Sequence, residues 1–151
     1  MLEEYEKKRH FNKTYEPSAH DSLGSSEMPI FVVQRHNARN LHYDFRLEMD
    51  GVLKSWAVPK QPPKEKGTKR LAVQTEDHPL TYASFEGEIP AGEYGAGKVE
   101  IWDKGTFELR KREEKEIVVT LHGEELKGDY VLIRTKYGKE EKGWLFFKSA
   151  D

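Results

Sequence analysis

From residue 29 onward, apolar and polar residues alternate in short runs, and turn-forming residues separate one run from the next. Such alternation is typical of β-strands, because successive side chains of a strand point to opposite faces of the sheet. The pattern predicts strands at residues 30–35, 41–49, 52–58, 70–75, 98–102, 106–110, 117–121, 129–135 and 144–148. Turn signals lie at Asp50-Gly51, Asp103-Lys104-Gly105, His122-Gly123 and Tyr137-Gly138. So many short strands with almost no helical periodicity predict an all-β barrel or sandwich.

Residues 1–28 differ in character from the remainder of the chain. The first ten residues are mostly charged and predict a short helix, whereas Pro17, Ser18 and the run Gly24-Ser25-Ser26 predict a loop. We therefore expect an N-terminal segment at residues 1–28, followed by a β-barrel domain at residues 29–151.

Composition narrows the possible chemistry and partners. The length of 151 residues fits one domain, and a formal net charge of −2 disfavours broad wrapping of a nucleic acid duplex while allowing local capture of a terminal phosphate. Because the chain has no cysteine, any metal must be held by His, Asp, Glu or water. No apolar run is long enough to span a membrane, and the N-terminus lacks the features of a signal peptide. We expect an intracellular, cytoplasmic protein.

The strand predicted at residues 41–49 has an unusual set of polar residues on one face. Alternation places the apolar residues of this strand on one side and His42, Asp44, Arg46 and Glu48 on the other. One interpretation is an ordinary amphipathic strand whose polar face lies in water. Such faces favour Thr, Lys, Glu and Ser, however, so the order His-Asp-Arg suggests a chemical site instead.

The second interpretation of this face is a metal site. His36 precedes the strand across a short turn and can fold back as a third ligand beside His42 and Asp44. Two neutral imidazoles and one carboxylate are a common ligand set for a divalent transition metal. Arg46 would then lie where a metal-bound phosphate needs a second positive partner, since its planar guanidinium matches two phosphate oxygens.

A second cluster follows the strand predicted at residues 70–75, in the run Glu76-Asp77-His78-Pro79. These residues are common in turns, and a simple turn is one interpretation. A histidine at the end of a strand can also face a pocket, where it serves as a phosphate ligand or a general acid.

Several long motifs occur in this chain in a characteristic order. They are Phe31-Val32-Val33-Gln34-Arg35-His36, Leu41-His42-Tyr43-Asp44-Phe45-Arg46-Leu47-Glu48, Leu53-Lys54-Ser55-Trp56-Ala57-Val58-Pro59-Lys60, Glu76-Asp77-His78-Pro79 with Tyr82, and Phe85-Glu86-Gly87 followed by Ile89-Pro90. Together they resemble the 3′-phosphoesterase domain of bacterial and archaeal DNA ligase D, here as a free-standing chain.

This resemblance implies a compact β-barrel with a polar central cavity and a preference for manganese. It implies that His36, His42 and Asp44 hold the metal, and that Arg46 and His78 contact the scissile phosphate. The remaining positions that match the family are Glu76 and Tyr82 in the catalytic group, and Gln34, Lys60, Arg70, Arg9 and Glu16 in binding phosphate or nucleic acid. Arg9 and Glu16 belong to the N-terminal segment, which the resemblance places near the active site.

The implied activity is removal of a 3′-terminal ribonucleotide to leave a 3′-phosphate, followed by removal of that phosphate to give a 3′-OH. The implied substrates are DNA or RNA/DNA primer-template 3′ ends, and the implied partners are a DNA ligase, a polymerase or primase and an end-binding protein. One departure lies in the N-terminal segment, where the family has Arg-Asp-Phe and this chain has Arg9-His10-Phe11. His10 lacks the negative charge of Asp, although a neutral imidazole can itself bind a metal or accept a hydrogen bond.

Two other functions fit parts of the pattern. His42 and Asp44 with a distal histidine, at His78 or His122, resemble the ligand triad of non-haem iron oxygenases. A non-catalytic barrel that binds single-stranded nucleic acid is the other alternative, and it would present exposed aromatic residues on a basic groove. Trp56, Trp102 and Trp144 lie within strand patterns, which favours a place in the core or barrel wall.

Overall fold

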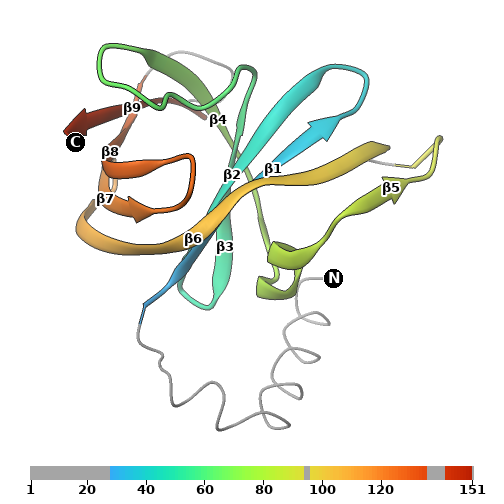
Figure 1. The fold of residues 1–151 in the computed structure, drawn as a ribbon, viewed down its shortest axis with the longest axis horizontal. Coiled ribbons are helices and arrows are strands. Elements are labelled where there is room, and N and C mark those ends of the chain that lie inside the picture. Colours follow the sequence, from blue (N-terminus) through green and yellow to red (C-terminus); the bar gives the residue numbers. More distant parts are fainter. Residues whose placement is uncertain (1–27, 94–95, 136–141, 151) are drawn as a thin grey trace, which may run out of the picture.

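The computed structural model describes residues 28–93, 96–135 and 142–150, which form nine strands and one short 3₁₀ helix (Figure 1). The elements are β1 (Ile30–Asn37), β2 (Leu41–Met49), β3 (Val52–Val58), β4 (Lys69–His78), η2 (Leu80–Ser84), β5 (Gly87–Ile89), β6 (Gly97–Glu113), β7 (Glu116–His122), β8 (Lys127–Arg134) and β9 (Gly143–Ala150). No helix in this described part of the chain has the length and apolar character needed to cross a membrane.

The strands form a closed antiparallel barrel. Neighbouring strands follow the order β1-β2-β3-β4-β9-β8-β7-β6, and β6 pairs back onto β1, so eight strands complete the ring. The first part of the long strand β6 pairs with β1 and its second part with β7, while the short strand β5 pairs with residues 97–99 of β6 outside the ring. The prediction of an all-β barrel is confirmed.

The centre of the barrel is apolar. The rings of Phe45 and Phe146 stack with their centroids 4.5 Å apart, and Trp56 meets Trp144 edge-on at 5.8 Å, so large aromatic side chains from opposite walls fill the interior. The polar central cavity that the family resemblance implied is therefore corrected by the structure. Alternation turns the apolar face of each strand inward, and the buried polar residues of β1, β2 and β3 lie on the outer face of the wall.

The turn predicted at Asp103-Lys104-Gly105 is also corrected, because these residues lie within β6 and pair with β1. The carboxylate of Asp103 is buried and accepts hydrogen bonds from the backbone N–H groups of Lys104, Glu124 and Leu126 at 2.8–2.9 Å. A polar residue that is typical of turns thus stabilises the neighbouring β7–β8 loop. Gly105 is needed in the strand because a Cβ atom there would overlap the carbonyl of His122.

We expect Asp103→Ala to lower the free energy of unfolding by about 2–4 kcal/mol, because each buried N–H group left without an acceptor costs about 1–3 kcal/mol. Urea denaturation followed by tryptophan fluorescence measures this change. Asp50→Asn is the matched control, since it removes an exposed carboxylate that pairs with Arg112 and, at 4.0 Å, with Lys54, and it should cost less than about 1 kcal/mol. Equal stability of the two variants would contradict the role assigned to Asp103.

Candidate active site

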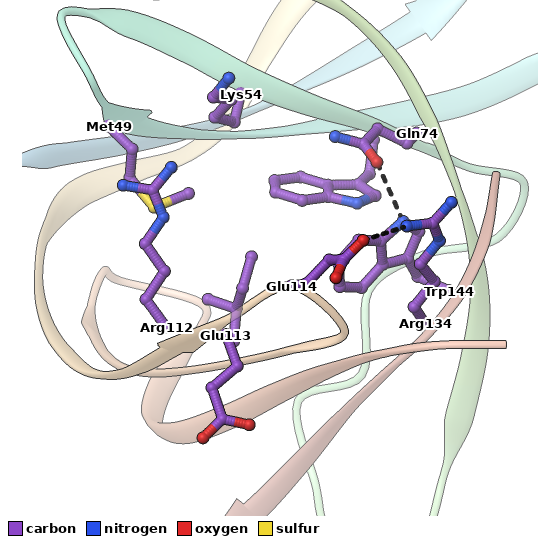
Figure 2. Close-up of a pocket in the computed structure, with 10 residues that line it drawn as sticks. Met49, Lys54, Gln74, Arg112, Glu113, Glu114, Arg134 and Trp144 are labelled. Atoms are coloured by element: carbon purple, nitrogen blue, oxygen red, sulfur yellow. Dashed lines mark hydrogen bonds and ion pairs between the residues drawn. The ribbon is translucent and has the colours of Figure 1, made fainter.

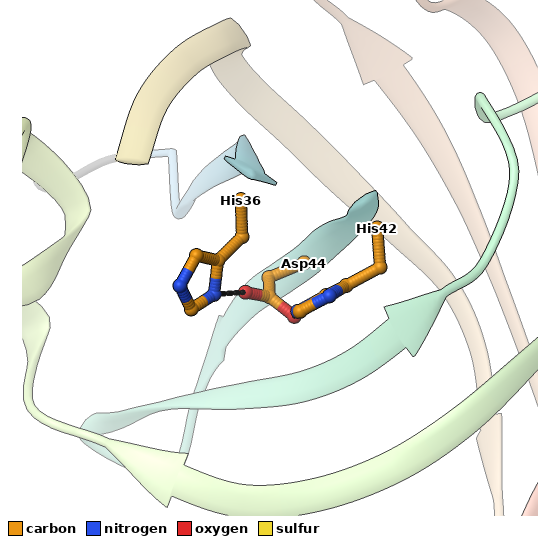
Figure 3. A group of neighbouring side chains, drawn as sticks. All are labelled: His36, His42 and Asp44. Atoms are coloured by element: carbon orange, nitrogen blue, oxygen red, sulfur yellow. Dashed lines mark ion pairs between the residues drawn. The ribbon is translucent and has the colours of Figure 1, made fainter. Parts of the chain in front are cut away.

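The three metal-ligand candidates, His36, His42 and Asp44, come together through the pairing of β1 with β2. His36 lies directly opposite His42, and Gln34 lies opposite Asp44. Residues that face one another across an antiparallel pair share a face of the sheet, and so do residues two positions apart on one strand. His36, His42 and Asp44 therefore project together from the outer wall of the barrel (Figure 3).

The side chains of this cluster are close enough to share one cation. Nε2 of His42 lies 3.2 Å from Oδ1 of Asp44, Nδ1 of His36 lies 3.7 Å from Oδ2 of Asp44, and one ligand atom from each residue falls within 4.8 Å of the others. Ligand atoms on opposite sides of a bound transition ion lie about 4.2 Å apart, twice a typical bond of about 2.1 Å. The donor set of two imidazoles and one carboxylate also suits such an ion. The residues present therefore fit a divalent transition metal after small adjustments.

Hydrogen bonds around the cluster orient the ligand atoms. Nδ1 of His42 lies 3.2 Å from the carbonyl of Asn40, and an N–H donated there leaves Nε2 directed at Asp44. The hydrogen bond with Asp44 is the main cause of a raised pKa of His42, and it outweighs burial, which lowers that pKa. Burial alone would raise the pKa of Asp44, but the hydrogen bond from His42 and the charge of Arg46 together lower it. Asp44 is thus held as a carboxylate.

Arg46 is buried beside the cluster, and contacts with four other residues fix the position of its guanidinium. Its Nε donates to Oε1 of Gln34 at 2.7 Å, its Nη1 donates to Oγ of Ser55 at 2.8 Å, and its Nη2 lies 3.4 Å from Asp44. Its guanidinium carbon also lies 4.9 Å from the ring centroid of Tyr82. Nη2 has two N–H groups, and the contact with Asp44 uses one of them. The other lies next to the candidate metal site and is not used by any of the contacts just described.

Ser55 is a site residue for which the sequence analysis predicted no role. The β2–β3 pairing places it opposite Arg46, where it is fully buried. The two-residue turn Asp50-Gly51 sets this pairing, so counting outward from the turn would have identified Ser55.

Gln34 connects Arg46 to the segment that covers one side of the site. While its Oε1 accepts from Arg46, its Nε2 donates to the carbonyls of Tyr82 and Phe85 at 2.8 and 3.2 Å. The rings of Tyr82 and Phe85 stack at 5.0 Å, and the ring of Tyr82 faces Arg46. Helix η2 is thereby held against the outer wall of β1 and β2.

His78 joins the site from the end of β4. Its Nδ1 lies 3.2 Å from Nη1 of Arg46 and 3.1 Å from the carbonyl of Glu76, and its ring packs 4.9 Å from the ring of Tyr82. A neutral ring can satisfy only one of the two Nδ1 contacts at a time, because Arg46 donates and the carbonyl accepts. Burial lowers the pKa of His78, and the nearby charge of Arg46 lowers it further, so the ring is neutral at pH 7.

Within the described part of the chain, the remaining predicted site residues do not contact the cluster of His36, His42 and Asp44 directly. Lys60, on the loop after β3, and Glu76 are exposed, and Arg70 donates from Nε to the carbonyl of Gln61. Among the described residues, no direct hydrogen bond joins these three side chains to the cluster. The predicted positions Arg9, His10 and Glu16 lie outside the described residues, as do residues 1–27 of the predicted N-terminal segment.

A separate pocket of about 410 Å³ lies at one end of the barrel (Figure 2). Trp56, Trp144, Lys54, Arg112 and Arg134 are among the residues that line it, and none of the metal-ligand candidates does. Its basic side chains already have acidic neighbours, since Arg112 pairs with Asp50 at 2.6 Å and Lys54 with Asp77 at 3.1 Å. Among the described residues, the metal-ligand candidates therefore lie outside this pocket.

Comparisons with a family model and with individual proteins point to the same family. A family model described as the DNA Ligase D 3′-phosphoesterase domain matches residues 34–134. The multifunctional non-homologous end joining DNA repair protein LigD of Mycobacterium tuberculosis is 51% identical over 89% of this chain and 18% of its own length. The corresponding protein of Pseudomonas aeruginosa is 49% identical over 99% of this chain and 19% of its own length. The chain thus spans about a fifth of the length of these relatives.

We expect Gln34→Leu to release η2 from the wall, because the carbonyls of Tyr82 and Phe85 and Nε of Arg46 would each lose their hydrogen bond with Gln34. The expected loss of stability is about 2–3 kcal/mol, with faster amide exchange at the N–H groups of Tyr82 and Phe85. Hydrogen–deuterium exchange measures this effect. Ser84→Ala is the control, because Ser84 is exposed and, within the described residues, its hydroxyl donates one long hydrogen bond to the carbonyl of Thr81. Unchanged exchange in the Gln34 variant would show that the side chain does not hold η2.

Proposed function

Because this chain belongs to the DNA ligase D 3′-phosphoesterase domain family, we propose that it is a metal-dependent phosphoesterase that processes 3′ ends in DNA repair. It hydrolyses the phosphodiester at a 3′-terminal ribonucleotide so that the ribonucleoside leaves and a 3′-phosphate stays on the primer, and it then hydrolyses that phosphate to give a 3′-OH that a ligase can join. The observation that carries the proposal is the outer-wall cluster of His36, His42 and Asp44 beside the buried guanidinium of Arg46.

The charge distribution supports a local phosphate-binding site. The chain as a whole has a formal net charge of −2, so its attraction for a polyanion must come from local features. Arg46 offers such a feature, since its bound partners fix its plane and leave an Nη2 N–H for a phosphate oxygen. We infer DNA or RNA/DNA primer-template 3′ ends as substrates, with a DNA ligase, a polymerase or primase and an end-binding protein as partners.

His36, His42 and Asp44 would hold the metal, which we propose to be manganese. When bound, such an ion withdraws charge from a phosphate oxygen and makes the phosphorus easier to attack. Arg46 stabilises the charge of the phosphoryl oxygens from the adjacent side. His78, neutral and next to Arg46, donates a hydrogen bond from Nε2 to the phosphate when its Nδ1 accepts from Arg46.

The structure disfavours both alternatives raised by the sequence. The oxygenase alternative required His78 or His122 beside His42 and Asp44, but neither lies in the cluster, and the buried guanidinium of Arg46 next to Asp44 suits a phosphate instead. His78 contacts Arg46, and His122 pairs with Glu108 on the surface at 2.7 Å. The single-strand-binding alternative required exposed aromatic residues, but Trp56 and Trp144 are buried and Trp102 packs against the core.

The activity is tested with an end-labelled primer-template that carries a single 3′-ribonucleotide, incubated with Mn²⁺. We expect a 3′-phosphate product that is converted to a 3′-OH product. His42→Ala, Asp44→Ala and Arg46→Ala should each lower the rate by at least about 10²–10³-fold, because each removes a group that stabilises charge in the transition state. His122→Ala is the matched histidine control and should process the primer normally. Normal processing by all three site variants would refute the assignment.

Metal binding should depend on pH in a direction set by His42. The raised pKa of His42 means that a proton occupies the imidazole up to a higher pH than in an ordinary histidine, and a metal must displace that proton. Affinity for Mn²⁺ should therefore be full above this raised pKa and decline as pH falls through it. Calorimetric titration between about pH 8 and pH 5, which spans the ordinary histidine pKa of about 6.5, measures the decline. An affinity that is constant over this range, or unaffected by His42→Ala, would contradict the ligand set.

A further inference from the structure

The pairing of β3 with β4 contains one extra residue on β4. Ser55 pairs with Thr75, and two positions earlier on β3, Leu53 pairs with His78. Two steps along β3 thus correspond to three steps along β4, which defines a β-bulge at Glu76 and Asp77 opposite Lys54.

This bulge decides which side chain of β4 faces the site. Ser55 points toward Arg46, so a regular strand would place Asp77, two positions after Thr75, on that same face. The extra residue shifts the alternation by one, and His78 takes the place opposite Leu53. From there, its Nδ1 reaches within 3.2 Å of Arg46.

An ion pair spans the bulge from the opposite side of the wall. Nζ of Lys54 donates to Oδ2 of Asp77 at 3.1 Å, and both side chains are partly buried, with 24% and 30% of their surface exposed. Lys54 points away from the site and lines the separate pocket of the barrel (Figure 2). Its other acidic neighbour, Asp50, lies farther away at 4.0 Å.

We propose that Lys54 and Asp77 are positioning residues, whose ion pair stabilises the β4 bulge and thereby presents His78 to the phosphate site. Neither residue touches the substrate, and both act through the backbone of β4. Asp77 directly precedes His78, so a change in its backbone angles moves the imidazole. The role in turnover rests on the proposed phosphoesterase function, whereas the role in placing His78 is structural and can be measured separately.

Steady-state kinetics on the 3′-ribonucleotide primer test the role in turnover. We expect Asp77→Asn and Lys54→Met each to lower kcat by about 10- to 100-fold, because a displacement of about 1 Å in a catalytic group can cost about 10²-fold. The double variant should be no slower than either single variant, since both remove the same interaction. Arg112→Gln is the matched control. It breaks the ion pair between Arg112 of β6 and Asp50 in the β2–β3 turn, and it should leave kcat unchanged.

Nuclear magnetic resonance tests the placement of His78 without any turnover. In the wild type, contacts between the ring protons of His78 and Tyr82 should give nuclear Overhauser effects, because the ring centroids are 4.9 Å apart. These signals should weaken in Asp77→Asn and Lys54→Met and persist in Arg112→Gln, with the dispersed amide spectrum of a folded barrel in every case.

The outcomes separate the two proposals. If the wild type shows no phosphoesterase activity but the ring contacts depend on Asp77 and Lys54, the proposed function fails and the positioning role stands. If the wild type is active while both variants keep their kcat and their ring contacts, the positioning role is overturned. Additive losses in the double variant would also overturn it, because the two residues would then act independently.

Discussion

The whole site depends on the register of one β-hairpin. Asp50 and Gly51 join β2 to β3 with positive φ angles of 59° and 79°, the geometry of a two-residue hairpin turn that matches the twist of its strands. This turn sets the pairing that brings Arg46 opposite Ser55. A slip of one residue would move Phe45 out to solvent and Arg46 into an apolar interior. Because an unpaired guanidinium in such a place is very costly, the constraint that forms the core also orients the site.

Burial of Arg46 is tolerable because the neighbouring strands supply it with partners. Its guanidinium donates hydrogen bonds to Gln34 of β1 and Ser55 of β3, and the carboxylate of Asp44 on β2 balances its charge. Such a network is rigid, and its electrostatic interactions are stronger in the low dielectric of a protein wall than in water. A phosphate bound beside Nη2, as proposed above, would meet a donor that needs no reorganisation, which is the condition for effective stabilisation of a transition state.

Strand positions, the β2–β3 turn and the candidate ligands could be predicted because alternation is a local property of the sequence. The same alternation places Phe45 and its apolar neighbours inside, so the residues themselves favoured the observed apolar centre over the polar cavity that the family resemblance implied. What could not be predicted depends on pairing between distant strands. Two of the three backbone N–H groups that donate to Asp103 belong to a loop more than twenty residues away, and the bulge at Asp77 exists only relative to β3.

The position of the cluster on the outer wall bears on the kind of substrate that it can process. The interior of an eight-stranded barrel is only wide enough for side chains to fill, and here aromatic rings fill it. A site at the centre would therefore admit at most a small molecule. On the outer wall, His36 and Asp44 are buried while His42 is partly exposed, and the η2 segment, held by Gln34 and carrying Tyr82, limits one side of the cluster. A site on the wall is therefore compatible with the proposed action on the end of a polymer, whereas the filled interior is not.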